Sequence, residues 1–326
     1  MNGNPISVIV PVRDAEGTIG ETLRSVFSSS DPPGEVIVVD DGCADRSIEI
    51  ARGYPVRIER TALPGGVARA RNAGARASRG SILLFVDADV VLEPGAIRAA
   101  ADALADPSVS VAVGLQSPVP PFPNAASVYK NYWLHYTYRK RAERVAVLYS
   151  SAVAIRREPF ERVGGFDPNY RTPNIEDSDL GKRLSDAGCR IAVVPKMEFR
   201  HIKRYDTGGM FRTDFRRTVG MTKVQLRDRL RRIMRGNYSS IPTSFLVSCL
   251  APWITIPLFA AGEPVPALLL PPALVLLLNH DWLRSLAGSQ GARAGLLGML
   301  FLHLDVVAVN LGVLWGIAEY AAGKKY

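Results

Sequence analysis

The sequence predicts an α/β fold with a mostly parallel sheet flanked by helices, followed by a group of apolar helices towards the C-terminus. Two observations predict the sheet: apolar runs over residues 36–41 and 82–89 that end in carboxylates, and helical patterns that alternate with such runs. The near absence of charge after residue 241 predicts the apolar helices. Uninterrupted runs of β-branched and aromatic residues are typical of strands buried on both faces, as in parallel sheets.

Strand and helix patterns alternate through the first hundred residues. Residues 6–11 form the first predicted strand, and residues 18–28 place apolar side chains at helical spacing. Further helices are predicted over residues 47–52 and over the Ala-rich and Arg-rich residues 66–79. Strands and helices of these lengths indicate right-handed crossovers between parallel strands.

Pairs of carboxylates follow two of the predicted strands, Asp40 with Asp41 and Asp87 with Asp89. Ligands of parallel sheets bind at the carboxyl ends of the strands, so these acids are expected at a binding site. Mg²⁺ and Mn²⁺ prefer carboxylate and phosphate oxygens, which predicts a metal and nucleotide site. The alternative is that Asp87-Ala88-Asp89 is an ordinary solvated turn, because Asp favours turns.

A second acidic cluster begins a predicted helix over residues 177–186. Glu176 and Asp177 stand just before its apolar positions, where the helix dipole stabilises carboxylates. Either acid could accept the proton of an attacking hydroxyl, a step worth about 10²–10⁴-fold in rate. First-turn acids are also common as simple helix caps, and that alternative stays open for an isolated cluster.

Six motifs in this order resemble those of family 2 glycosyltransferases with a GT-A nucleotide-diphospho-sugar transferase fold. They are Ser7-Val-Ile-Val-Pro-Val-Arg-Asp14, Val39-Asp-Asp-Gly42 with Asp45 and Ser47, Ala70-Arg-Asn-Ala-Gly74, Asp87-Ala-Asp89, Val163-Gly-Gly-Phe-Asp167, and Glu176-Asp-Ser-Asp-Leu180 with Arg183. The resemblance covers roughly residues 5 to 200 and implies an inverting transfer from a nucleotide-activated sugar.

The resemblance also implies roles for individual residues. Asp177 would be the catalytic base, with Glu176 beside it, and Asp89, Asp87 and His201 would hold a divalent metal, Mg²⁺ or Mn²⁺. The implied donor-binding residues are Pro11, Arg13, Asp40, Asp41, Arg71 and Asp87. The assignment of His201 as a metal ligand rests only on the region in which it lies, and an isolated histidine is more often a surface or packing residue. No Gln-x-x-Arg-Trp motif, which processive members usually carry, occurs between residues 198 and 236, so a single transfer is expected.

Three apolar stretches follow the catalytic motifs, over residues 241–261, 265–278 and 294–318. The first is long enough to cross a hydrocarbon core, which needs about 20 helical residues. The second is broken by prolines, which predicts a kinked span or a re-entrant piece. The third holds His303, Asp305 and Asn310, which should face a partner helix, a lipid head group or water. A buried helical core of a soluble domain is the alternative, although such helices usually show a polar face.

The formal charge of +9 is concentrated before the first apolar stretch. Residues 211–236 contain eight arginines and one lysine against two aspartates, interleaved with apolar side chains. Such a segment is drawn to anionic lipid and obeys the positive-inside rule. Nucleic-acid binding would also explain the arginines, but no nucleic-acid motif accompanies them. We expect the acceptor or lipid side to include Tyr132, Trp133, Arg139, Arg216 and Arg217, with a solvated amphipathic helix as the alternative for the first three.

The expected organisation is a catalytic domain over residues 1–210, a basic juxtamembrane segment over 211–240 and two to three membrane helices over 241–326. No signal peptide precedes the first strand, so the catalytic domain should face the cytoplasm from the inner or plasma membrane. The partners would be a nucleotide-sugar donor and a polyprenyl-phosphate, lipid-linked or other glycan acceptor of the cell envelope, and no nucleic acid. A nucleotidyltransferase and a non-catalytic sugar-nucleotide-binding scaffold remain as alternative functions.

Overall fold

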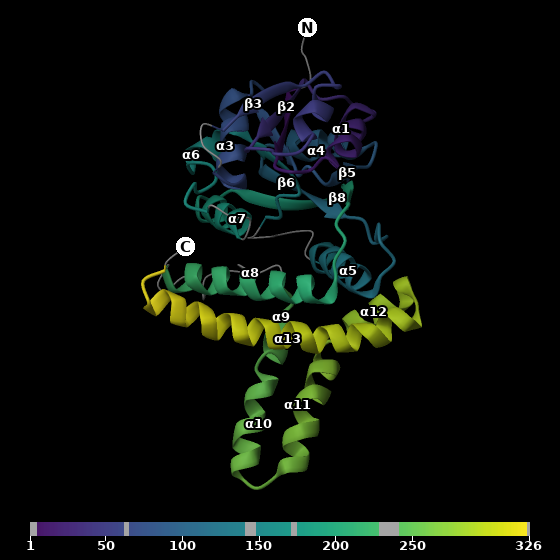
Figure 1. Cartoon of the computed structure of the whole chain (residues 1–326), viewed down its shortest axis with the longest axis vertical. Helices are drawn as coiled ribbons and strands as arrows, with labels where there is room; N and C mark the ends of the chain where they lie inside the picture. The colour runs from purple at the N-terminus through teal and green to yellow at the C-terminus, as the bar shows by residue number, and fades with distance from the viewer. Residues whose placement is uncertain (1–4, 62–64, 141–147, 171–174, 228–240, 325–326) are drawn as a thin grey trace. The chain divides into compact units, whose positions relative to one another are not determined.

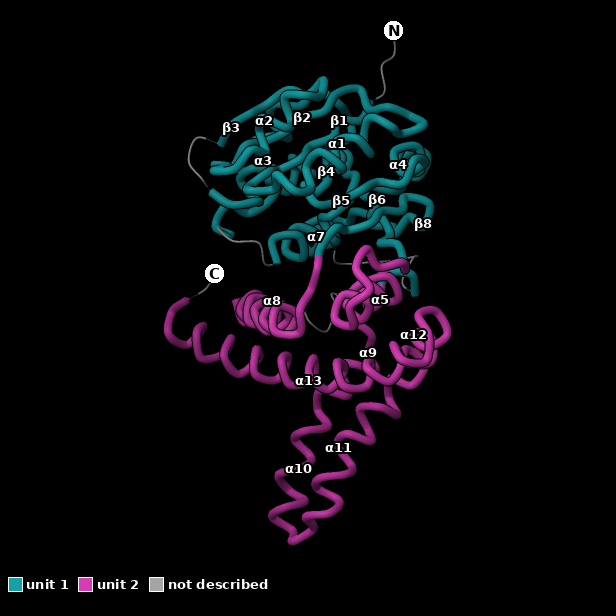
Figure 2. The backbone as a smooth tube through the Cα atoms, turned by 45° about the vertical axis from the view of Figure 1, so that its right-hand side comes forward, with its two compact units in different colours: residues 1–117, 138–203, 236–240 teal, residues 118–137, 204–235, 241–326 magenta. Residues whose placement is uncertain are grey.

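The computed structural model of the chain describes residues 5–61, 65–140, 148–170, 175–227 and 241–324. It contains two compact units, shown in separate colours in Figure 2. Unit 1 comprises residues 1–117, 138–203 and 236–240, and unit 2 comprises residues 118–137, 204–235 and 241–326. Most of the helix that begins at Ala125 is therefore grouped with the C-terminal helices, whereas we expected the first 210 residues to form one domain. Residues 228–240 of the expected juxtamembrane segment lie outside the described residues.

Unit 1 is built on a mixed sheet whose described strands have the order β3-β2-β1-β4-β7-β6-β8-β5. These strands are β1 (Ile6–Val12), β2 (Glu35–Asp40), β3 (Arg57–Arg60), β4 (Ile82–Val86), β5 (Val90–Leu92), β6 (Val109–Gln116), β7 (Ala152–Arg156) and β8 (Arg190–His201). The first four in the sheet are parallel, as the alternation of strands and helices predicts. β7 is antiparallel to both β4 and β6, β6 is parallel to β8, and β5 is antiparallel to β8.

Helices accompany this sheet in unit 1 (Figure 1). They are α1 (Ile19–Phe27), α2 (Ser47–Ala51), α3 (Val67–Ala77), α4 (Ala96–Ala105), α6 (Arg157–Arg162) and α7 (Glu176–Asp186). A Cβ on Gly74 would lie 2.4 Å from Cγ2 of Ile9, so α3 can approach β1 this closely only because that position has no side chain. The predicted arrangement of a largely parallel sheet flanked by helices is confirmed.

The carboxyl ends of β1, β2 and β4 lie at one edge of the sheet. Val12 is in register with Asp40 across β1 and β2, and Ile9 of β1 is in register with Phe85 of β4. Asp87 follows β4 directly. The carboxylates that the sequence places after separate strands are thus brought to the same edge of unit 1.

Unit 2 is helical in all its described elements. It contains residues 125–137 of α5 (Ala125–Arg139), together with α8 (Thr207–Arg227), α9 (Thr243–Ser248), α10 (Ala251–Ala260), α11 (Pro264–Leu278), α12 (His280–Gln290) and α13 (Ala292–Ala321). Its core is a group of aromatic rings from α5, α9, α12 and α13, including Tyr129, Trp133, Phe245, Trp282 and Phe301.

Two helical segments among the described residues are long and apolar enough to cross a membrane, Thr243–Ala260 and Ala292–Ala321. A third is possible if α11 and α12, which meet at a bend of 63°, form one broken span. The polar residues of α13 each contact another helix. His303 lies 3.3 Å from the carbonyl oxygen of Pro272, Asp305 accepts a hydrogen bond from Tyr129, and Asn310 accepts one from Trp253.

Candidate active site

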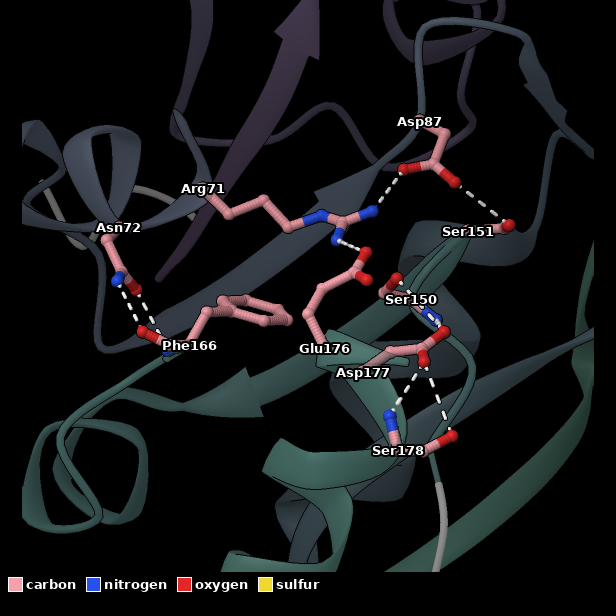
Figure 3. A network of polar contacts seen from close by, with 9 residues as sticks. All are labelled: Arg71, Asn72, Asp87, Ser150, Ser151, Phe166, Glu176, Asp177 and Ser178. Carbon is pink, nitrogen blue, oxygen red and sulfur yellow. Dashed lines mark hydrogen bonds and ion pairs between the residues drawn. The ribbon is translucent and has the colours of Figure 1, made fainter. Parts of the chain in front are cut away.

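A buried arginine connects two of the predicted acids at the edge of the unit 1 sheet (Figure 3). Arg71 of α3 is 2% exposed, and its two terminal nitrogens donate to Oδ1 of Asp87 at 2.6 Å and to Oε1 of Glu176 at 3.0 Å. Burial alone would lower the pKa of Arg71, but the charges of Asp87 and Glu176 outweigh it and raise that pKa. Both terminal nitrogens are engaged with carboxylates, and a place for Arg71 near the nucleoside or its phosphates remains a prediction.

Glu176 and Asp177 are adjacent in sequence but lie in different surroundings. Glu176 is buried and paired with Arg71, so its charge is neutralised inside unit 1. Asp177 is half-buried, and its Oδ1 accepts the backbone N–H of Ser178 at 2.7 Å. Its Oδ2 lies 3.5 Å from both the backbone nitrogen and Oγ of Ser150. Of the two acids, Asp177 is the one with access to solvent.

The Gly164-Gly165-Phe166 motif holds the ring that supports Arg71. Both glycines have positive φ, +82° and +68°, which an L side chain rarely adopts. The side-chain amide of Asn72 bonds both the N–H and the C=O of Phe166, at 2.9 Å and 2.7 Å (Figure 3). The Phe166 ring lies 5.2 Å from the Arg71 guanidinium, within range of a cation–π contact.

Asp40 and Asp41 use their carboxylates to hold backbone, and a contact of either with the nucleotide base remains a prediction. Oδ1 of Asp40 accepts from the N–H groups of Gly42 and Cys43, and its other oxygen pairs with Arg60. Burial would raise the pKa of Asp40, but these hydrogen bonds outweigh it and lower that pKa. The Asp41 carboxylate accepts from Thr61 and from the N–H groups of Gly65 and Gly66. Both acids are buried, and their hydrogen bonds fix the loops in which they lie.

The loops after β1 and β2 are joined by side chains. Asp14, whose φ is +49°, accepts from the N–H of Ala44, Asp45 accepts from the N–H of Glu16, and Ser47 accepts from the N–H of Ala15. Pro11 is buried within β1, whereas Arg13 is exposed at the start of the first loop. The expected roles of Arg13 and Pro11 in donor binding remain predictions.

Two of the three expected metal ligands lie together. Nε2 of His201, at the end of β8, is 3.0 Å from Oδ2 of Asp89, and its Nδ1 is 3.3 Å from the hydroxyl of Tyr149. Burial would raise the pKa of Asp89, but the hydrogen bond and charge of His201 outweigh it and lower that pKa. The third expected ligand, Asp87, instead binds Arg71 and Ser151. No cluster of three His, Cys, Asp or Glu side chains suited to a metal occurs among the described residues.

One oxygen and one imidazole nitrogen nevertheless fit a divalent cation that takes its remaining ligands from a phosphate and water. Mg²⁺ is commonly bound by one or two protein carboxylates plus substrate phosphates, and imidazole is acceptable to Mn²⁺. Asp89 and His201 would hold such an ion, and Asp87 would organise Arg71 beside them.

The expected acceptor residues fall into two groups. Tyr132 and Trp133 are buried in the helical core of unit 2, where Tyr132 lies 2.7 Å from Oγ of Ser285 and Trp133 packs against Trp282. These rings are not open to stack on a sugar, so we reassign both residues to the core. Arg139 and Arg216 are exposed, and Arg217 is half-buried. Their role at the acceptor side remains a prediction.

Several residues of the site carry no assignment from the sequence. Asn72, Phe166 and Arg183 belong to recognised motifs, but only the folded chain shows that Asn72 and Arg183 fix the backbone around the paired glycines. Ser150 and Ser151 belong to no motif. The joint occurrence of their motifs in one chain is the signal that could have identified Asn72, Phe166 and Arg183 as site residues.

Comparisons with known proteins identify relatives of this chain. The family model described as glycosyl transferase family 2 matches residues 7–164, and the model described as the N-terminal domain of galactosyltransferase matches residues 135–207. The uncharacterized glycosyltransferase EpsJ of Bacillus subtilis is 40% identical over 88 residues, which cover 26% of this chain and 26% of the relative. Glycosyltransferase AglE of Haloferax volcanii is 27% identical over 234 residues, which cover 69% of this chain and 75% of the relative.

The chain spans about a quarter to a half of the length of the first two curated relatives that it matches. Among solved structures, a mannosyltransferase from Pyrobaculum calidifontis in complex with GDP-Man and Mn²⁺ has a TM-score of 0.61 at 20% identity. That likeness covers 97% of this chain and 90% of the other, and it establishes a shared fold.

Proposed function

The chain belongs to glycosyltransferase family 2, and on that premise we propose that it moves a single sugar, with inversion, from a nucleoside-diphosphate sugar to a membrane-associated acceptor. The acceptor class is a polyprenyl phosphate or a lipid-linked glycan. The observation that carries the proposal is the contrast in burial between Glu176, which is 4% exposed and paired with Arg71, and the neighbouring Asp177, which is half-buried and reached by solvent.

In the proposed reaction Asp177 takes the proton of the attacking hydroxyl, which is a sugar hydroxyl of a lipid-linked glycan or the P–OH of a monoprotonated polyprenyl phosphate. The hydroxyl oxygen forms a bond to the anomeric carbon while the bond from that carbon to the nucleoside diphosphate breaks, and the diphosphate leaves with the electron pair. Attack opposite the leaving group inverts the anomeric centre. Ser150 and Ser178 orient the Asp177 carboxylate, and Arg71 holds the Glu176 carboxylate in an ion pair.

The pairing of Asp89 with His201 supports a divalent cation beside the donor. Such an ion, when bound, would stabilise the charge that develops on the departing diphosphate. Asp87 positions the Arg71 fork instead of binding the ion. The loops after β1 and β2, joined through Asp14, Asp45 and Ser47, would receive the nucleoside at the carboxyl edge of the sheet.

The proposal is tested with purified full-length protein and a panel of UDP-, GDP- and dTDP-sugars, supplied with Mn²⁺, Mg²⁺ or a chelator and with polyprenyl phosphate as acceptor. We expect metal-dependent release of one nucleoside diphosphate and an inverted anomeric centre in the product. With a lipid-linked glycan supplied as the acceptor, Asp177→Asn should reduce transfer to its sugar hydroxyl by about 10²–10⁴-fold and leave donor affinity unchanged, because the amide cannot accept the proton.

Asp186→Asn is the matched control, since Asp186 is an exposed acid at the other end of the same helix. Loss of donor binding together with transfer in Asp177→Asn would show that Asp177 is structural. Transfer to a soluble sugar without any lipid acceptor would overturn the acceptor class, and donor binding without turnover in the wild type would favour a scaffold function.

A further inference from the structure

The C-terminal half of α13 packs along α8 within unit 2 (Figure 1). A Cβ on Gly312 would lie 2.7 Å from Cβ of Thr218, and a Cβ on Gly316 would lie 2.8 Å from Cβ of Thr222. One turn further, Lys223 and Glu319 form an ion pair at 3.1 Å. The two backbones therefore run side by side in the same direction at close range, and the two helices share one depth in any membrane.

The charged side chains of α8 determine the depth at which the two helices lie in a membrane. Its described residues include the exposed Arg212 and Arg216, besides Arg217, Lys223 and Arg227. A single arginine at the centre of a bilayer is costly, and several on one helix exclude it from the hydrocarbon core. Arginines at the membrane surface are instead drawn to anionic lipid. α13 cannot cross the core while it stays packed along such a helix.

The opposite side of α13 is apolar and exposed. Large side chains from successive turns remain uncovered there, including Leu296, Leu300, Val307, Leu311 and Leu314. Such a face can contact acyl chains in a helix that spans the bilayer and in one that lies along its surface, so the charge of α8 decides between the two. Although α13 is long enough to span a membrane, we therefore expect it to lie along the membrane surface.

α10 and α11 form a hairpin that projects away from α13, as Figures 1 and 2 both show. The large exposed side chains of its two helices are apolar, including Trp253, Ile256, Phe259, Leu268 and Leu269, and the exposed Glu263 lies at the turn. The base of the hairpin is bonded to α13. Asn310 accepts from Trp253 and donates to the carbonyl oxygen of Cys249, while Nε2 of His303 lies 3.3 Å from the carbonyl oxygen of Pro272.

The hairpin reaches only part of the way through a bilayer. From Trp253 to the turn at residues 261–263 the helix rises roughly 12 Å, at about 1.5 Å per residue. From Pro272 back to the same turn the rise is also roughly 12 Å. The hydrocarbon core is about 30 Å thick, so a hairpin based on an interfacial α13 ends within the nearer leaflet.

We propose that unit 2 is a monotopic membrane anchor for one leaflet of an anionic bilayer, with α8 and α13 in the interface and the α10–α11 hairpin re-entrant. Both ends of α13, and the residues after it, then lie on the same side as unit 1. Lys324 lies on that side too, in agreement with the positive-inside rule. The inference concerns the placement of unit 2 and is independent of sugar transfer.

The first test uses single cysteines in a background of Cys43→Ser, Cys189→Ala and Cys249→Ala, in proteoliposomes probed with a membrane-impermeant maleimide. Glu158→Cys reports unit 1, Lys324→Cys and Ala322→Cys report the end of α13, and Glu263→Cys reports the turn of the hairpin. We expect positions 158, 322 and 324 to react from the same side and position 263 to react only after detergent is added.

Three outcomes would overturn the proposal. Reaction of position 322 or 324 from the side opposite to position 158 would make α13 a span. Reaction of position 263 from that opposite side would make the hairpin a span. Full reaction of position 263 without detergent, in a protein that does not float with vesicles, would assign the apolar face to a second copy of the chain or to solvent.

The second test measures binding of the protein to vesicles with 30% anionic lipid. Each surface arginine contributes roughly fivefold in affinity, so Arg212→Gln with Arg216→Gln should weaken binding by roughly tenfold to thirtyfold at low salt. Arg76→Gln with Arg79→Gln removes the same charge from unit 1 and should leave binding unchanged. An equal loss in both pairs would show that the charge of α8 has no special relation to lipid.

Discussion

The two units each bury a cation that joins carboxylates from distant parts of the chain, and the cation of unit 1 belongs to the candidate site. In unit 1, Arg71 links Asp87 to Glu176. In unit 2, Lys130 of α5 pairs with Asp214 of α8, close to Asp305 of α13, which accepts a hydrogen bond from Tyr129. The same device thus organises a reactive edge in one unit and cross-links three helices in the other.

The difference in side chain matches the difference in task. Arg71 presents a planar fork that holds two carboxylates at fixed positions, which a lysine ammonium cannot do. Lys130 acts as a point charge between acids. Burial alone would lower the pKa of Lys130, but the charges of Asp214 and Asp305 outweigh it and raise that pKa. Geometry matters in unit 1, whereas charge balance is enough in unit 2.

The largest effect is expected from Arg71→Met. Removing the cation takes the Arg71 ion pair away from the buried Glu176 and the half-buried Asp87, which should lower the free energy of unfolding by about 3–5 kcal/mol. Transfer should also be lost in the fraction that remains folded, because Glu176 is released beside Asp177. Chemical denaturation and donor turnover measure the two effects. Arg71→Lys should recover part of the stability and little of the activity, and full recovery of activity would contradict a positioning role for the fork.

Lys130→Met is expected to cost a similar order of stability, but no activity per folded molecule. Asp214 and Asp305 are then left buried without their cation. Replacing the group together, as Lys130→Met, Asp214→Leu and Asp305→Leu, should restore stability, since well-packed apolar residues often equal or exceed a buried ion pair. Thermal unfolding in detergent and turnover per folded molecule provide the readouts. Failure of the triple variant to recover would mean that unit 2 needs these charges for more than balance.

A smaller effect is expected where α8 and α13 meet. Gly316→Ala would place a methyl group 2.8 Å from Cβ of Thr222 and 3.0 Å from the carbonyl oxygen of Val219, so the two helices must separate. Such overpacking typically costs about 1–3 kcal/mol. Gly288→Ala in α12 is the control, because nothing lies within 4 Å of its added methyl group and a helical alanine is favoured over glycine by up to about 1 kcal/mol. If both changes were neutral, the close helix pairing that we describe would be incorrect.

The sequence predicts unit 1 better than unit 2 for a physical reason. Buried parallel strands with intervening helices leave a strong local pattern, so β1, β2, β4 and α7 lie within a few residues of the expected ranges. Tyr132 and Trp133 were wrongly placed at the acceptor side because an amphipathic aromatic helix looks the same whether its partner is a ligand or a distant helix. The partner, α12, is about 150 residues away and leaves no mark on the local sequence.

The same limit applies inside the site. The sequence identifies Asp40, Asp41, Arg71 and Glu176 as polar residues of conspicuous motifs, but it does not show that their charges face inward. Burial reveals this, because a buried carboxylate must find N–H groups or a cation. Asp177 remains the candidate base because, unlike the neighbouring Glu176, it is only half-buried.

The smallest effect is expected from acid, which should lower the stability of unit 1 by protonating Asp40. The pKa of Asp40 is lowered in the folded state because the N–H groups of Gly42 and Cys43 and the Arg60 side chain favour its charged form over the cost of burial. A lowered pKa contributes stability that is present above the unfolded value of 3.8 and is lost as the pH falls through the folded value. The unfolding free energy of the wild type should therefore decline below about pH 4.

Asp40→Asn should be less stable at neutral pH, and its stability should change less than that of the wild type between about pH 5 and pH 3. Asp186→Asn, an exposed change in the same unit, should keep the wild-type slope. Chemical denaturation at several pH values, followed through unit 1 by activity and by protease protection, measures the slopes. Equal slopes for Asp40→Asn and the wild type would place the acid sensitivity elsewhere in the chain and would leave Asp40 as a neutral organiser of its turn.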